Sequence, residues 1–145
     1  MLGDARLTLE AQPTQQFDLM AIDAFSSDAI PVHLLTREAF ALYFRHLKPS
    51  GILAVHVSNR YLDLVPVVAR NAHDFGKASV DVDDEDEEED YFSNSDWVLV
   101  TNDGSIFHDA AFKSSSVQPT HLRPSLRPWT DDYSNLFQIL KVNEK

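Results

Sequence analysis

The chain has 145 residues, of which 43% are hydrophobic, so it is long enough to form one domain with a buried core. It contains no cysteine, which excludes disulfides and thiol catalysis. Its formal net charge of -11 and its lack of a basic stripe argue against nucleic acid as a partner, because a negative field repels phosphate.

The hydrophobic segments are short and interrupted by charges. None approaches the roughly 18 to 20 apolar residues of a membrane span, and the first residues lack the apolar region of a signal peptide. We therefore expect a chain without a membrane segment, located in the cytoplasm.

Strands and helices are expected to alternate through the first half of the chain, which is typical of an α/β fold. A Pro-containing break follows the first helical turn, and short apolar runs rich in β-branched residues mark the strands. In chain order we expect a helical turn or loop at 7–10, a buried strand at 17–23, a helix from Thr36 to about Leu47, a strand at 52–57 and a helix from 62 to about 75.

The second half begins with an acidic run that supplies nine of the 23 acids of the chain. Because such a run repels itself and stays solvated, we expect an acidic surface loop at 81–92. A third strand is expected at 96–101 and a fourth at 135–142, joined by a loop-rich connection that contains three prolines.

The segment Phe17–Pro31 is the most informative part of the sequence, because an apolar run stops abruptly at Asp23 and is followed by a polar turn with Ser26, Ser27 and Asp28. In open α/β sheets, ligands bind outside the carboxyl ends of the strands. Asp23 is therefore a candidate functional residue. The alternative is that it caps the following helix.

Four segments together resemble the polyamine aminopropyltransferases, the spermidine synthase family, and especially the bacterial members fused to membrane transporter segments. They span nearly the whole chain. The segments are Gly3–Arg6, Phe17–Pro31 with Leu34–Phe40, Gly51–Arg60 and Trp129–Asn135.

The resemblance implies the C-terminal half of a Rossmann-like fold of the S-adenosylmethionine-dependent methyltransferase type, with a mostly parallel sheet and flanking helices. The whole chain, 1–145, would be a single partial catalytic domain. The family's Gly-rich cofactor turn is missing, since no two of the four glycines lie close enough to form Gly-x-Gly-x-x-Gly. We therefore expect the first βαβ unit of the fold to be absent from this chain.

The reaction that the resemblance implies transfers an aminopropyl group from decarboxylated S-adenosylmethionine to an amine such as putrescine. Asp23 matches the family's catalytic acid, which accepts a proton from the amine; burial at a strand end would raise its pKa toward a useful value. Asp28 matches the second acid, which binds the amine. The two are five residues apart here and three apart in the family motif, and Asp28 has helix capping as its alternative role.

The remaining site residues also follow from the resemblance. Asp4 and Ala5 match a segment in which the Asp accepts a hydrogen bond from the adenine amino group. Ser58 and Asn59 end the second strand, where the family's amine pocket lies, although a turn role is equally compatible. Three adjacent residues would complete a cation site through charge and cation–π contact, with capping and exposure as the alternative: Asp131, Asp132 and Tyr133.

The six histidines show no metal-binding spacing, so no metal is implied, and His56 is expected to be a core histidine rather than a general base. Two further functions remain open. One is an S-adenosylmethionine-dependent methyltransferase-like protein, because the same sheet hosts both reactions. The other is a non-catalytic fragment that completes a partner's sheet along the open edge of strand 17–23. The expected partners are a polyamine or another small amine, together with a second copy or a separate N-terminal half.

Overall fold

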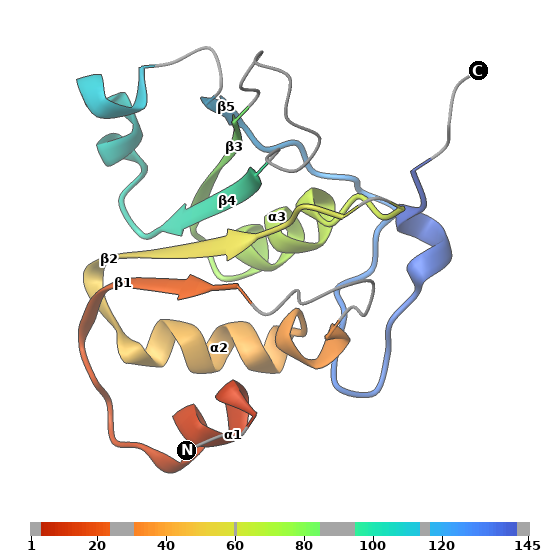
Figure 1. The fold of residues 1–145 in the computed structure, drawn as a ribbon, viewed down its shortest axis with the longest axis horizontal. Coiled ribbons are helices and arrows are strands. Elements are labelled where there is room, and N and C mark those ends of the chain that lie inside the picture. Colours follow the sequence, from red (N-terminus) through yellow and green to blue (C-terminus); the bar gives the residue numbers. More distant parts are fainter. Residues whose placement is uncertain (1–3, 24–30, 60, 85–94, 114–116, 142–145) are drawn as a thin grey trace.

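The computed structural model describes residues 4–23, 31–59, 61–84, 95–113 and 117–141. Five strands form one mixed sheet in the order β1–β2–β4–β3–β5, with helices packed beside it (Figure 1). The strands are β1 (Phe17–Ile22), β2 (Leu47–His56), β3 (Ala78–Asp84), β4 (Ser95–Thr101) and β5 (Val117–Pro119). The α-helices are α1 (Ala5–Ala11), α2 (Arg37–His46) and α3 (Val65–Asp74), and the 3-10 helices are η1 (Val32–Leu34), η2 (Gly104–His108), η3 (Ala110–Phe112) and η4 (Leu136–Ile139).

The expected α/β fold is confirmed, but the expectation of a mostly parallel sheet is wrong. Only β1 and β2 pair in parallel among the described strands, and the other three pairings are antiparallel. Only ten residues of sequence separate β3 from β4, fewer than a crossover between parallel strands needs, and β4 pairs antiparallel with β3. β4 is inserted between β2 and β3, which therefore run in the same direction without being neighbours.

The hydrophobic core lies on one face of the sheet. Alternate residues of three strands point into it, as the period of two in a strand requires, and they meet the apolar stripes of α2 and α3. These core residues include Met20, Ile22, Leu53, Val55, Val98 and Val100 from the strands and Phe40, Tyr43, Val67 and Val68 from the helices. α2 and α3 therefore cover the same face of the sheet. The strand residues that alternate with the core residues point to the opposite face.

Local capping determines where the helices begin. The Thr36 hydroxyl accepts a hydrogen bond from the Ala39 amide at 3.3 Å, and so α2 begins where the sequence predicts. α3 begins at Val65 instead of residue 62. The cause is Asn59, whose side-chain oxygen accepts hydrogen bonds from the Tyr61 and Leu62 amides and holds that stretch in a turn.

β1 is an edge strand of the described sheet, and it is buried only in part, contrary to the expectation of a buried strand at 17–23. Its burial alternates, because only the core-facing residues are covered by α2 and α3. Leu19 is 61% exposed and Phe17 is 38% exposed. One face and one edge of β1 are therefore available for further contacts.

Two other expected elements differ from the structure. Residues 81–84 of the expected acidic loop belong to β3, where Val80 and Val82 alternate with Asp81 and Asp83; residues 85–92 lie outside the described part of the chain. The expected strand at 135–142 is wrong as well, because Asn135 caps a 3-10 helix, η4, by accepting a hydrogen bond from the Phe137 amide at 3.1 Å. None of the described helices has the length and apolar character needed to cross a membrane.

Candidate functional site

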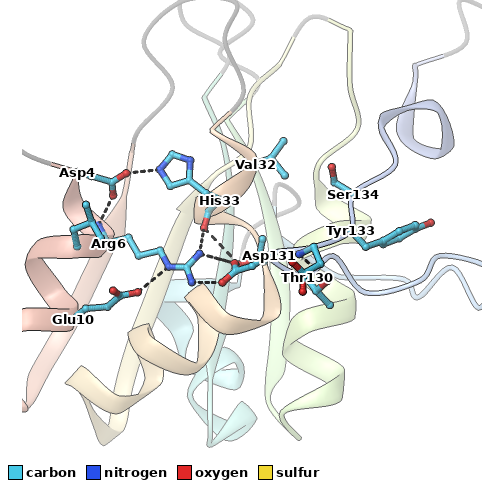
Figure 2. Close-up of a pocket in the computed structure, with 12 residues that line it drawn as sticks. Asp4, Arg6, Glu10, Val32, His33, Thr130, Asp131, Tyr133 and Ser134 are labelled. Carbon is cyan, nitrogen blue, oxygen red and sulfur yellow. Dashed lines mark hydrogen bonds and ion pairs between the residues drawn. The ribbon is translucent and has the colours of Figure 1, made fainter.

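A cavity of about 570 Å³ lies between α1 and the 130–134 segment (Figure 2). Its walls come from three places: the start of α1, η1 with the start of α2, and the segment 130–134. The lining includes four residues that the sequence singles out, namely Asp4, Asp131, Asp132 and Tyr133.

Arg6 of α1 joins these three walls. Its guanidinium donates two parallel hydrogen bonds to Asp131, with Nη1–Oδ1 at 2.7 Å and Nη2–Oδ2 at 2.6 Å. It also donates to the Glu10 carboxylate at 3.2 Å and to the His33 carbonyl at 2.9 Å. The Arg6 side chain is only 14% exposed. A bidentate pair of this kind fixes the geometry of both partners, so Arg6 holds the 130–134 segment against α1.

Asp131 is held from a second side by the start of α2. The Thr36 hydroxyl donates to Asp131 Oδ1 at 2.8 Å, and the Asp131 amide donates to Glu38 at 3.0 Å. The hydrogen bonds from Arg6 and Thr36 keep the pKa of Asp131 below its usual value. Its carboxylate is therefore ionised and already engaged within the protein, and substrate binding by Asp131 stays a prediction.

Asp132 and Tyr133 line the same cavity next to Asp131. The Asp132 amide donates to the Thr130 hydroxyl at 3.3 Å, whereas no described side chain pairs with its carboxylate. The Arg127 guanidinium lies 4.3 Å from the centre of the Tyr133 ring and covers one ring face. Of the two adjacent acids in the lining, Asp132 is the one without a cationic partner among the described residues.

Asp4 lies at the other wall, as the N-cap of α1. Its carboxylate accepts a hydrogen bond from the Arg6 amide at 2.9 Å and pairs with His33 Nε2 at 2.8 Å. Desolvation alone would raise the pKa of Asp4, but the Arg6 amide and the neighbouring His33 outweigh it and lower that pKa. Ala5, the first residue of α1, is not part of the cavity lining.

Asp23 lies in a separate group at the carboxyl ends of β1 and β2. Its Oδ1 is 2.9 Å from His56 Nδ1, and the His56 ring stacks on Trp97 with ring centres 4.9 Å apart. The Asp23 side chain is 58% exposed, so the expected burial is wrong: the residue follows an edge strand and points away from the core. His56 of the central strand β2 alternates with the core residues Val55 and Val57, so it points to the opposite face with its side chain 19% exposed, and its expected position in the core is wrong.

The other residues predicted at these strand ends are engaged by distant parts of the chain. The Ser58 hydroxyl accepts from the Asp96 amide at 2.7 Å, and the Asn59 carbonyl accepts from Lys141 at 2.7 Å. Neither lines the described cavity. Asp28 lies outside the described residues.

Several residues of the cavity lining were given no role from the sequence, among them Arg6, Glu10 and His33. Arg6 belongs to the quoted Gly3–Arg6 segment, but its partner lies 125 residues away, and no local pattern indicates such a pairing. Among the described residues, no group of three or more His, Asp or Glu side chains is placed to hold a metal ion. Comparison of the chain with protein-family models and with curated proteins finds no match.

Proposed function

We propose that this chain is the second half of a spermidine synthase-like domain and that its cavity contributes to the site of aminopropyl transfer from decarboxylated S-adenosylmethionine to an amine. One observation carries the proposal. Asp4 near the start of the sequence and Asp132 and Tyr133 near its end, all selected by the family resemblance, line one cavity. Its volume of about 570 Å³ falls within the usual range of small-molecule sites.

The charges around the cavity favour a cationic ligand. Its lining has four carboxylates, those of Asp4, Glu10, Asp131 and Asp132, and a single arginine. Because Arg6 is paired with Asp131 and Glu10, it has little capacity left for a ligand carboxylate. Decarboxylated S-adenosylmethionine carries a sulfonium and an ammonium group and no carboxylate. The cavity therefore suits this donor better than S-adenosylmethionine, which supports aminopropyl transfer over methyl transfer.

The order of the strands also supports the proposal. Three strands, β1, β2 and β3, run in one direction, and β4 is inserted antiparallel between the last two. The open edge of β1 leaves room for the missing first half of the proposed domain to continue the sheet. The carboxyl ends of β1 and β2 and the start of α2 lie toward the same side of the molecule (Figure 1).

In the proposed reaction each group has a role that follows from its chemistry. The Asp4 carboxylate accepts a hydrogen bond from the adenine amino group, and Asp132 with the Tyr133 ring attracts the cationic parts of the ligands. The acceptor amine attacks the carbon next to the sulfonium, the carbon–sulfur bond breaks with its electron pair passing to sulfur, and methylthioadenosine leaves. The proton lost by the amine passes to the group at the strand ends, to which Asp23 belongs.

Calorimetric titration tests the proposal. The full chain is titrated with decarboxylated S-adenosylmethionine, methylthioadenosine and S-adenosylmethionine, each with and without putrescine. We expect the first two to bind more tightly than S-adenosylmethionine, and Asp132→Asn to weaken the decarboxylated donor about tenfold, as expected for the loss of one charged contact. Asp103→Asn, which removes an exposed charge remote from the lining, is the control. No heat from any ligand with the folded chain would contradict the proposal.

A second candidate function rests on the exposed edge and face of β1. Phe17 and Leu19 are exposed there, and an unpaired strand edge is a template for pairing with another chain. On this reading the chain completes a partner's sheet without catalysis. Light scattering of the purified chain tests it: a monomer with full ligand binding would contradict this reading, whereas an oligomer broken by Leu19→Lys, with no ligand binding, would favour it.

A further inference from the structure

A second, smaller cavity of about 180 Å³ lies where β2 and β3 begin and β4 ends. Two lysines, Lys48 and Lys77, belong to its lining, which contains no acidic residue from the described part of the chain. In the whole sequence, acids outnumber Lys and Arg by 23 to 12. The smaller cavity is therefore a local positive site on an acidic protein, and its charge is opposite to that of the larger cavity.

The Lys77 ammonium group is partly shielded from water and lacks a carboxylate partner among the described residues. Its Nζ donates to the side-chain oxygen of Asn102 and lies 4.8 Å from the centre of the Phe44 ring. Both of these partners are neutral. Desolvation lowers the pKa of Lys77, which shows that the positive charge is held here at a cost. Because charges removed from water are normally paired, the contacts of Lys77 leave a place for a counter-ion.

Lys48 brings a second ammonium group to the same cavity. Its Nζ donates to Asp18 Oδ1 at 2.8 Å, and the Asp18 side chain is 81% exposed and lies outside the lining. An ammonium group has three N–H donors. After the bond from Lys48 to Asp18 and the bond from Lys77 to Asn102, each lysine retains two donors for a ligand.

The other polar side chains of the lining hold the walls together. The buried Thr101 hydroxyl donates to the Gly51 carbonyl at 3.2 Å, and the Asn102 amide nitrogen donates to the Pro49 carbonyl at 3.2 Å. These bonds tie the end of β4 to the first residues of β2. The cavity is therefore already formed without a ligand, and an ion would not have to order its walls.

We propose that this cavity binds a small oxyanion with two negative charges, such as phosphate, between the ammonium groups of Lys77 and Lys48. Its volume is below the roughly 300–1,000 Å³ of usual small-molecule sites, so it suits an ion better than a larger ligand. Lysine binds phosphate as a point charge, and two lysines match a doubly charged ion. The site is separate from the proposed aminopropyl transfer and does not depend on it.

Amide chemical shifts of the ¹⁵N-labelled chain test the site by titration with inorganic phosphate at constant ionic strength. We expect the amides of Lys77, Thr101 and Asn102 to shift and to saturate with a dissociation constant of about 1 mM. Lys77→Met should weaken binding about tenfold, as expected for the loss of one charged contact, whereas Lys77→Arg should retain most of it. Lys113→Met, at an exposed lysine outside the lining, is the matched control.

Further ligands identify the chemistry that is recognised. Sulfate should bind as phosphate does, because it has the same shape and charge, and chloride should not. Ribose 5-phosphate distinguishes the two sources of the group: binding as tight as that of phosphate assigns the site to a phosphate ester, and weaker binding assigns it to the free ion. Circular dichroism verifies that each variant is folded.

Three results would overturn the proposal. The first is a phosphate response no larger than that of chloride. The second is unchanged phosphate binding in folded Lys77→Met and Lys48→Met variants. The third is a Lys113→Met variant that loses as much affinity as Lys77→Met, because this would show a general attraction to surface lysines.

Discussion

Removal of the Arg6 guanidinium should destabilise the fold measurably, because this side chain connects three segments. Two hydrogen bonds to Asp131, at 2.7 and 2.6 Å, are charge-assisted, and such bonds contribute about 1.5–3 kcal/mol each when they are shielded from water. The Asp131 side chain is 42% exposed, so in a variant without the guanidinium water can replace much of the hydrogen bonding that the carboxylate loses. We expect Arg6→Met to lower the free energy of unfolding by about 2 kcal/mol and Arg6→Lys, which keeps the charge but not the bidentate geometry, by about 1 kcal/mol.

The assay is thermal and urea unfolding followed by circular dichroism. A loss of about 2 kcal/mol corresponds to a fall in Tm of about 4–8 °C for a domain of this size. Arg70→Met is the matched control, because Arg70 pairs with Asp74 within one helix turn, at 3.2 Å, and such pairs contribute about 0.5 kcal/mol or less. An Arg6→Met variant no less stable than Arg70→Met would refute the reasoning.

The effect of Arg6 should also depend on pH in a defined direction. The pKa of Asp131 is lower in the folded chain than its ordinary value, mainly because of the hydrogen bond from Arg6. Its contribution to stability is therefore fully present above the unfolded pKa of about 3.9 and is lost as the pH falls through the lower folded value. The stability difference between the unmodified chain and Arg6→Met should shrink below pH 4. A difference that grows in acid would contradict this assignment.

Two further substitutions test the sheet. Gly51→Ala should destabilise the fold by about 1–3 kcal/mol, because the new methyl group in β2 would lie 2.9 Å from the Phe17 carbonyl oxygen. Urea unfolding measures the loss, and unchanged stability would contradict the close approach of β1 to β2. Asp96→Asn should raise Tm at pH 7.5 but not at pH 4, since burial and the neighbouring Asp83 raise the pKa of Asp96 to about 6. The folded chain therefore binds the Asp96 proton more tightly than the unfolded chain, and the stability that this proton contributes is lost as the pH rises from about 4 to 6. An equal change in Tm at both pH values would contradict the raised pKa of Asp96.

The elements that sequence predicted well are those with strong local signals. β4 begins within one residue of the prediction, and α2 begins at a Thr cap that the sequence displays. β3 was missed because the charge of the acidic run obscured its alternation of Val80 and Val82 with Asp81 and Asp83. The antiparallel pairings were not predicted, because strand direction depends on the connections between strands, which apolar patterns do not encode.

The candidate site was predictable only in part for a similar reason. Family resemblance selected residues near both ends of the chain, and the fold brings Asp4 and Asp132 to one cavity. The partner of Asp131 was not predictable, because Arg6 is 125 residues away and its guanidinium reaches Asp131 only through the packing of α1 on α2. The pairing of Asp23 with His56 was accessible in principle: both residues follow apolar runs, and adjacent parallel strands bring their carboxyl ends together.

The most direct test of the central claim is to map the binding of methylthioadenosine on the ¹⁵N-labelled chain by amide chemical shifts. We expect shifts concentrated at the start of α1, at His33 and in 131–134, with weaker shifts at the same ligand concentration in Asp4→Asn, which changes the residue proposed to contact the adenine. Shifts centred on the smaller cavity of about 180 Å³ beside Lys48 and Lys77, or no shifts at millimolar ligand, would contradict it.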